Sequence, residues 1–127
     1  MNAKQLTLLP EIDEKEVQQI VIKELKAYRA LKVQIQNRRE QQEEGVVGLF
    51  PSLRHSDRLN EIKVRQVERA LEGSLDFIER QIVEMKYLNP EQIKDIEIYL
   101  ELRIKKNKYY NLKRIALNKL ATSLLII

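Results

Sequence analysis

The carboxyl-terminal stretch KKNKYYNLKRIALNKLATSLLII (105–127) decides the fold of this chain. Its apolar residues recur every three or four positions, which predicts an amphipathic helix. Three lysines, Lys105, Lys106 and Lys108, stand at the start of that helix. The amino end of a helix carries about half a positive charge, so each cation there is disfavoured by about 0.3–1 kcal/mol. A sequence that accepts this cost indicates a negatively charged partner at this end of the helix.

The distribution of charge along the chain supports the same interpretation. The net charge of the 127 residues is only +4. Seven basic residues and no acidic residue follow Glu101, whereas the part before Arg103 has 16 basic and 19 acidic residues. A basic segment of this kind is expected of a nucleic-acid-binding element. The alternative is a solvated basic face with no partner.

The composition favours an all-α protein. Hydrophobic residues make up 43% of the chain and charged residues 33%, while glycine and proline occur three times each. With no cysteine, disulfides and thiolate sites are excluded, and a cytoplasmic location is expected. The single histidine, His55, has no ligand or nucleophile near it in the sequence, and GVVG (45–48) is too short for a phosphate loop. We therefore expect no enzyme, no cofactor and no metal.

No segment has the character of a targeting or membrane-spanning element. The opening MNAKQLTLLPEIDEKE (1–16) has a short apolar run that is stopped by Pro10 and four acids, which is unlike a signal peptide. No stretch reaches the roughly 18 apolar residues that a bilayer-spanning helix needs. We expect no membrane partner.

Residues 1–42 are predicted to form a tail and a long helix. Asp13 is the predicted N-cap, with Glu16 three residues further on as in a capping box. Helical spacing links Val17, Ile20, Val21, Leu25, Tyr28, Leu31, Lys32 and Ile35. This stripe must be buried against a second copy of the chain or against its own later helices. We expect a homodimer, with internal packing as the alternative.

Residues 43–56, EEGVVGLFPSLRHS, are predicted to be an apolar loop or linker because they hold two glycines and Pro51. The apolar residues in it are Val46, Val47, Leu49, Phe50 and Leu53. Two interpretations remain open. The loop folds back onto the core of its own chain, or it is a docking segment for a partner.

Residues 57–127 are predicted to form a helical domain. A helix capped by Ser56 is expected to end at Gly73, and Ser74 or Asp76 is expected to cap the next one. Asn89-Pro90-Glu91 predicts a third helix start. The predicted inward residues of these helices are Leu59, Ile62, Val67, Ala70 and Leu71, then Phe77, Ile78, Ile82, Val83 and Met85, then Ile93, Ile96, Tyr99, Leu100 and Leu102.

The last two helices of this domain match a helix-turn-helix. About 11 and 19 residues are joined by a break near 103–105. In this motif the amino end of the second helix enters the major groove of double-stranded DNA. The inward residues predicted for that helix are Tyr109, Leu112, Ala116, Leu117, Leu120 and Leu124.

The remaining residues at the start of the last helix are candidates for DNA contacts. Asparagine pairs with adenine and arginine with guanine, whereas lysines usually bind phosphates and position the protein. The predicted base-edge contacts are Asn107, Tyr110, Asn111 and Arg114. The predicted phosphate contacts are Lys105, Lys106, Lys108, Lys113 and also Arg103. For Tyr110 the alternative is that its ring covers a neighbouring helix.

Two segments carry a resemblance to known proteins. ERQIVEMKYL (79–88) resembles the helix of sigma-factor region 4 that precedes its DNA-binding helices. KDIEIYLELRIKKNKYYNLKRIALNKLATSL (94–124) resembles the carboxyl-terminal signature of the ArpU-type phage transcriptional regulators. LLPEIDEKE (8–16) and KAYR (26–29) are similar to the opening of that family. Residues 38–56 add nothing to the resemblance.

The resemblance implies a sigma region 4-like domain that binds DNA and activates late phage genes in a bacterial cytoplasm, in association with the nucleoid. The ArpU-type proteins are related in architecture to the RinA-type activators. In two places the chain departs from the pattern. Arg103 stands where the turn usually has glycine, and Asp76 where a proline is common. Either the turn differs, or Arg103 is tolerated with a positive φ because it reaches a phosphate.

Two other functions remain open. The chain is alternatively a module that binds host RNA polymerase, with the loop 46–53 as a contact. It is alternatively a phage packaging protein similar to a small terminase subunit, although the DNA-binding part of those proteins is usually at the amino end.

Overall fold

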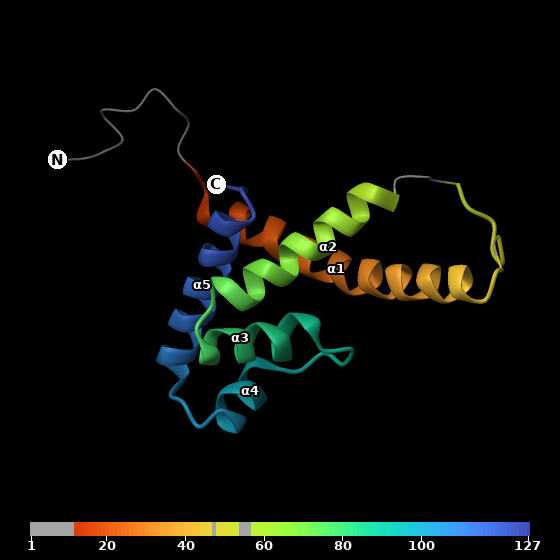
Figure 1. The fold of residues 1–127 in the computed structure, drawn as a ribbon. Helices are drawn as coiled ribbons and strands as arrows, with labels where there is room; N and C mark the ends of the chain where they lie inside the picture. The colour runs from red at the N-terminus through yellow and green to blue at the C-terminus, as the bar shows by residue number, and fades with distance from the viewer. Residues whose placement is uncertain (1–11, 47, 54–56) are drawn as a thin grey trace.

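The computed structural model describes residues 12–46, 48–53 and 57–127. All regular elements in this part of the chain are helical, which confirms the predicted all-α class. Figure 1 shows two long helices lying side by side as an arm, with the carboxyl-terminal helix crossing one end of it. Shorter helices fill the space below the arm (Figure 1). The predicted cap Ser56 and the single histidine, His55, lie outside the described residues.

Helix α1 (Glu14–Glu43) begins and ends close to the predicted positions. Asp13 is its N-cap, and the side chain accepts a hydrogen bond from the backbone N–H of Lys15 at 2.9 Å. Gly45, with φ of 68°, ends the helix in the left-handed conformation that glycine adopts without steric cost.

Helix α2 (Asp57–Gly73) runs antiparallel to α1 and forms the second half of the arm (Figure 1). The α1 stripe is buried inside the same chain, against α2 and helix α5 (Lys106–Ser123). The first hydrophobic core cluster contains Val17, Val21, Leu25, Tyr28, Val64, Val67, Ala70, Leu71, Leu75, Val83, Ala116, Leu117, Leu120 and Ala121. The alternative of internal packing is therefore the observed one, and α1 shares a core with residues 57–127. Ile20 and Leu59, both predicted to face inward, are exposed at 41% and 64%.

Helix α3 (Phe77–Val83) starts at the predicted N-cap Asp76. The Asp76 backbone N–H donates to Glu79 Oε1 at 2.8 Å, as in a capping box. The helix continues as a π-helical turn, η2 (Glu84–Leu88), which periodicity did not predict. The turn lies between the two core clusters. Tyr87 and Leu88 pack against the first cluster, while Met85 packs against the second.

The predicted helix start at Asn89-Pro90-Glu91 is wrong. The side chain of Asn89 accepts from the backbone N–H of Glu91 at 2.9 Å, which closes a local turn instead of capping a helix. Helix α4 (Asp95–Glu101) begins later, with Lys94 at its N-cap position. The motif therefore has a first helix of 7 residues, shorter than the predicted 11.

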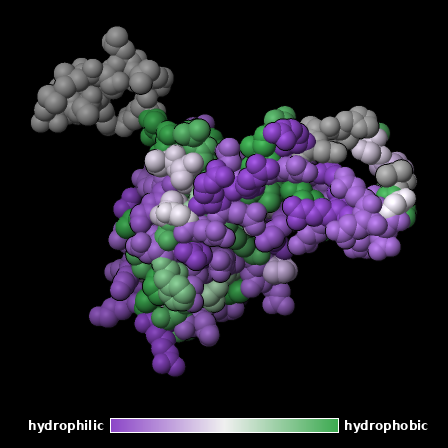
Figure 2. Space-filling model, viewed as in Figure 1, coloured by the Kyte–Doolittle hydropathy of each residue, from purple (hydrophilic) through white to green (hydrophobic). Residues whose placement is uncertain are grey.

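The later start of α4 also changes its inward face. Ile98, which was not predicted to be buried, is fully buried in a second cluster with Ile82 and Tyr109. Ile96 and Leu100 were predicted to face inward and are exposed at 51% and 65%. Figure 2 shows hydrophobic side chains gathered on the surface over the end of the molecule where α3 and α4 lie.

Helix α5 matches its prediction closely. Tyr109, Ala116, Leu117 and Leu120 are buried as predicted. Leu112 and Leu124 are half-buried and pack against the second and first cluster, respectively. Of the helices in the described ranges, none is both long and apolar enough to cross a bilayer.

The loop between α1 and α2 does not fold back onto the core. Its four described large apolar side chains are exposed by 37% at Val46, 57% at Leu49, 76% at Phe50 and 97% at Leu53. The interpretation of residues 43–56 as a hook on the core is therefore wrong for the described part. The loop sits at the far tip of the arm, away from α4 and α5 (Figure 1).

Candidate nucleic-acid interface

The turn between α4 and α5 is built on a non-glycine residue with a positive φ. Arg103 has φ of 57°. Its backbone N–H donates to the Leu100 carbonyl at 3.2 Å, and the Ile104 N–H donates to the Tyr99 carbonyl at 3.1 Å. These two bonds define a Schellman motif, which normally has glycine at the Arg103 position. The turn therefore has the geometry that is usual with glycine at this position. Because Arg103 stands there instead, its backbone conformation is strained.

At the start of α5, no nearby acidic side chain balances the partial positive charge of the helix amino end. Lys105 occupies the N-cap position and makes no side-chain cap, and the first turn has no acidic residue. Lys105, Lys106, Asn107 and Lys108 are all exposed. The backbone N–H groups of the first turn and three cations thus converge on one exposed end, where an anion is favoured.

A buried polar contact fixes α4 against α5. The Tyr109 hydroxyl donates to Asp95 Oδ1, with 2.5 Å between the oxygens, while the ring of Tyr109 is fully buried. The same oxygen of Asp95 lies 3.1 Å from the Nζ of Lys113 and 3.5 Å from the Nζ of Lys86. One carboxylate therefore joins α4, α5 and η2.

These contacts shift the pKa of both groups. Burial alone would raise the pKa of Asp95, but the hydrogen bonds from Tyr109 and Lys113 and the charge of Lys86 outweigh it and hold the pKa below its usual value. Burial and the contact with Asp95 raise the pKa of Tyr109 well above its usual value. Asp95 is thus an ionised acceptor and Tyr109 a neutral donor at neutral pH.

Lys113 was predicted to contact phosphate, and the structure places it differently from the other lysines. Its side chain is only 18% exposed because it reaches back to Asp95. The Nζ also lies 5.5 Å from the ring centre of Tyr109 and 4.9 Å from that of Tyr110. The charge of Lys113 is therefore partly neutralised by Asp95 within the protein.

Tyr110 is partly exposed and packs against the preceding residue of α5. The ring contacts Tyr109 edge-on at 5.2 Å between centres, so one side covers the packed part of the motif. The residue is nevertheless 40% exposed. Its exposed side lies on the same face of α5 as Asn107, Asn111 and Arg114, because these residues are three or four positions apart.

Arg114 lies on this face but is held by the protein. Its Nη1 is 3.2 Å from Glu14 Oε1 at the start of α1, and its Nη2 donates to Asn111 Oδ1 at 3.3 Å. Asn118 also donates to Glu14 Oε1, at 3.1 Å. The two predicted base-edge contacts Asn111 and Arg114 are thus brought together, with Glu14 as a competing partner for the arginine.

Sequence reasoning missed Asp95, Lys86 and Glu79. Glu79 is only 2% exposed and accepts from the Nζ of Lys119 at 2.9 and 3.1 Å. This contact raises the pKa of Lys119. The only available signal was that Asp95 and Glu79 stand in the first turns of short helices, where carboxylates are usually caps. Their side-chain partners lie from 9 positions away (Lys86 and Asp95) to 40 positions away (Lys119 and Glu79), which the sequence alone does not reveal.

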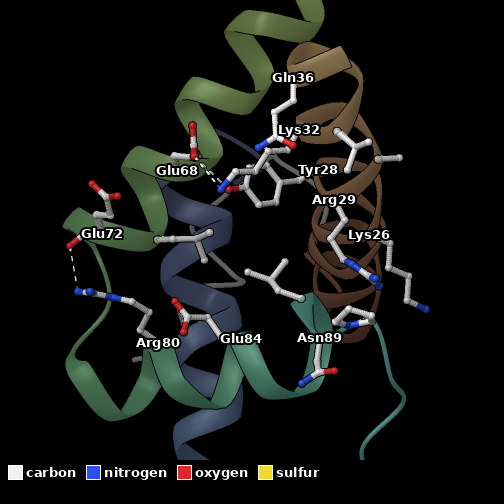
Figure 3. A pocket seen from close by; sticks show the side chains of 15 residues that line it. Lys26, Tyr28, Arg29, Lys32, Gln36, Glu68, Glu72, Arg80, Glu84 and Asn89 are labelled. Atoms are coloured by element: carbon white, nitrogen blue, oxygen red, sulfur yellow. Dashed lines mark hydrogen bonds and ion pairs between the residues drawn. The ribbon is translucent and has the colours of Figure 1, made fainter. Parts of the chain in front are cut away.

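A cleft of about 970 Å³ lies between α1, α2, α3 and η2. Of the acids that line it, Glu68 is held by its neighbours, as Figure 3 shows: it accepts from the Tyr28 hydroxyl at 3.2 Å and lies 3.5 Å from Lys32. Among the described residues no group of three or more acids, histidines or cysteines is placed to hold a metal ion.

Comparison of the chain with protein-family models, with curated proteins and with solved structures gives no match. The resemblance to the ArpU-type regulators and to sigma-factor region 4 therefore stays a prediction that rests on the residues quoted above.

Proposed function

We propose that this chain is a sequence-specific DNA-binding regulator of transcription that reads DNA with the amino end of α5. The observation that carries the proposal is the α4–turn–α5 unit. Its second helix begins with exposed Lys105, Lys106 and Lys108, with no side-chain cap and no acid in the first turn. A helix start with this much uncompensated positive charge is suited to a phosphate backbone.

Within this proposal the residues divide into two groups. Arg103, Lys105, Lys106 and Lys108 contact phosphates and set the position of the motif on the duplex. Asn107, Tyr110, Asn111 and Arg114 face the base edges in the major groove. Lys113 remains a phosphate contact only when DNA draws its Nζ away from Asp95. The proposal needs no catalytic step, cofactor or metal.

A titration at several salt concentrations tests the division. Four phosphate contacts give a slope of log affinity against log salt between about −3 and −4 per subunit, since each contributes about 0.9. Lys106→Gln weakens binding to all sequences alike and reduces the slope by nearly one unit. Asn111→Ala costs about 1–3 kcal/mol on the preferred site and little on scrambled DNA.

The preferred site is obtained first, by selection from a pool of random duplexes with the wild-type protein. The result that overturns the proposal is an unchanged ratio of selected to scrambled affinity in all three variants Asn107→Ala, Asn111→Ala and Arg114→Gln. In that case α5 does not read sequence.

The biological setting follows from the resemblance alone. On that basis we propose that the chain activates late phage genes, in the bacterial cytoplasm and in association with the nucleoid. Transcription from late phage promoters with and without the protein tests this part separately. Reduced transcription would indicate a repressor instead.

The exposed apolar loop favours a second candidate, an interaction module that binds host RNA polymerase. Leu49, Phe50 and Leu53 are exposed by more than half at the tip of the arm. A double variant Phe50→Ser and Leu53→Ser keeps the stability within about 0.5 kcal/mol because both side chains are already solvated. Loss of polymerase capture in this variant, without DNA present, supports the module. Unchanged capture would show that RNA polymerase contacts another part of the chain.

We propose a homodimer as the assembled form, although the α1 stripe is already buried inside one chain. The exposed apolar side chains at the tip of the arm offer one surface for such an interface. Light scattering at micromolar concentration distinguishes the outcomes. A monomer mass rejects the dimer, and a ring-sized mass favours a packaging protein similar to a small terminase subunit.

A further inference from the structure

A second basic surface lies next to the helix-turn-helix, in a groove of about 540 Å³ between α1, η2 and the segment that leads into α4. We call it the α1–η2 groove. Four cations line it: Lys26 and Arg29 of α1, Lys86 of η2, and Lys94 at the N-cap position of α4. Among its lining residues the only acid is Glu91.

Three of the four cations lack a paired acid in the part of the chain that the structure describes. The Nζ of Lys86 lies 3.5 Å from Asp95 Oδ1 and donates to the Ile93 carbonyl at 3.3 Å, so its charge is balanced by the Asp95 carboxylate. Within the described ranges, Lys26, Arg29 and Lys94 take part in no ion pair. Figure 3 shows Lys26 and Arg29 extending from α1 on the side of the cleft where Asn89 lies.

The sequence of α1 shows the same lack of compensation. Lys23, Lys26 and Arg29 are three positions apart, so they form one row on the helix surface. No acid stands three or four positions from Lys26 or Arg29. A row of like charges costs a helix a few tenths of a kcal/mol for each pair. This is the same pattern of uncompensated charge that marks the start of α5.

The groove is connected to α5 through Asp95. This residue, directly after Lys94, contacts Lys86 in the groove and Lys113 on α5. The groove therefore begins at the amino end of the first helix of the motif. A duplex that meets the amino end of α5 continues along its axis beyond the motif, with a phosphate charge every 1.7 Å or so.

We infer that the α1–η2 groove is a second phosphate-binding surface, in which Lys26, Arg29 and Lys94 hold the DNA backbone beside the segment that α5 contacts. This inference rests on the proposed function and extends its contact surface from the helix-turn-helix to the long amino-terminal helix. The occupant is the sugar–phosphate backbone of double-stranded DNA. No base is read in the groove, so its contribution is independent of sequence.

The test compares salt slopes on one random-sequence duplex of about 30 base pairs, close to three helical turns. The double variant Lys26→Gln and Arg29→Gln is expected to reduce the slope by about 1.8 units, since each lost phosphate contact removes about 0.9. Its ratio of affinity between a selected site and scrambled DNA stays unchanged. The matched control, Arg65→Gln and Arg69→Gln, removes two charges from exposed arginines of α2 that do not line the groove, and leaves the slope unchanged.

A further variant, Lys106→Gln with Lys108→Gln, separates this inference from the proposed function. If the α5 variant reduces the slope and the groove variant does not, the groove is rejected and the proposed function stands. If only the groove variant reduces it, α5 is rejected as the DNA-contacting helix and the groove stands. If neither does, both are rejected, and an acidic protein becomes the partner to test. If the α2 control reduces it equally, the effect is one of net charge and the groove is rejected.

Discussion

The carboxylate of Asp95, the first residue of α4, accepts a hydrogen bond from the hydroxyl of Tyr109 in the first turn of α5. The bond thus joins the two helices of the motif directly, and the Tyr109 ring is packed in the second cluster with Ile82 and Ile98. An apolar contact alone permits sliding, whereas a short polar bond fixes one relative position of the helices. The direction in which α5 presents its amino end therefore depends on this pair.

Removing the carboxylate should weaken both the fold and the motif. We expect Asp95→Asn to lower the free energy of unfolding by about 1–3 kcal/mol, because Tyr109 and Lys113 lose a charged acceptor in a half-buried place. Chemical denaturation at pH 7 measures this loss. Tyr109→Phe, which removes the donor and keeps the ring, should cost less. Equal stability of all three proteins would contradict the role assigned to the pair.

The same pair predicts a dependence on pH. The pKa of Asp95 is lower in the folded chain than its usual value of about 3.9. An acid with a depressed folded pKa stabilises the fold above its unfolded pKa, and this contribution is lost as the pH falls through the folded value. The difference in stability between wild type and Asp95→Asn should thus be constant above about pH 5 and shrink below about pH 4. A difference that is as large at pH 2 as at pH 7 would contradict this origin.

A second prediction concerns the strained turn. Arg103 has φ of 57°, a conformation that costs a non-glycine residue about 1–2 kcal/mol. Arg103→Gly removes this cost, partly offset by the greater freedom of glycine in the unfolded chain. The variant should therefore be more stable by about 0.5–1 kcal/mol, while its affinity for DNA falls because a phosphate contact is lost. Thermal unfolding and a binding titration give the two values.

Leu125 provides the matched control for that variant. Leu125 also has a positive φ, 61°, and lies in the same kind of turn. This turn follows the carboxyl end of α5, at the opposite end of the helix from Lys105. Leu125→Gly should raise the stability to a similar extent and leave DNA binding unchanged. If Arg103→Gly retains full affinity, Arg103 makes no phosphate contact and its strain has no functional explanation.

These residues illustrate how far the sequence predicts the site. The positions of Lys105, Lys106 and Lys108 on an exposed helix start were predictable, because helix periodicity and end effects are local properties of the chain. A break after α4 near Arg103 was also predicted, whereas the resemblance left open whether the turn differs or Arg103 has a positive φ. The contacts that were not predicted, those of Asp95 and Glu79, depend on residues that are distant in sequence.

The error at Asn89 has a similar physical cause. Asparagine followed by proline is typical of a helix start, but asparagine also closes local turns, and only packing decides between the two. Here the chain makes a turn and α4 begins at Asp95, so the inward residue is Ile98 and not Ile96 or Leu100. The π-helical turn at Glu84–Leu88 was likewise not predictable from local periodicity. Its residues pack against both hydrophobic clusters, and this tertiary packing is not visible in the sequence.

A third prediction separates stability from function at the start of α5. Lys106→Ala and Lys108→Ala should leave the free energy of unfolding unchanged or raise it slightly, because each removes a cation from the positive end of a helix. Both side chains are exposed. DNA affinity should fall in both variants. A loss of stability above about 1 kcal/mol would show that these lysines hold the fold, and their assignment to phosphates would then be wrong.

The last prediction concerns the competition for Arg114. This guanidinium is bound to Glu14 Oε1 at 3.2 Å in the DNA-free chain, so it must leave a carboxylate before it reaches a base. That partner is firmly ionised, since hydrogen bonds from Asn118 and Arg114 lower the pKa of Glu14. Glu14→Gln keeps the shape of the side chain and removes the charge. We therefore expect tighter binding of the variant to a selected site, and no comparable gain on scrambled DNA. Parallel titrations of Glu14→Gln and of Glu14→Gln with Arg114→Gln measure the effect, and the gain should disappear in the double variant. A gain that persists there would show that Glu14 repels the duplex directly, and that Arg114 does not read a base.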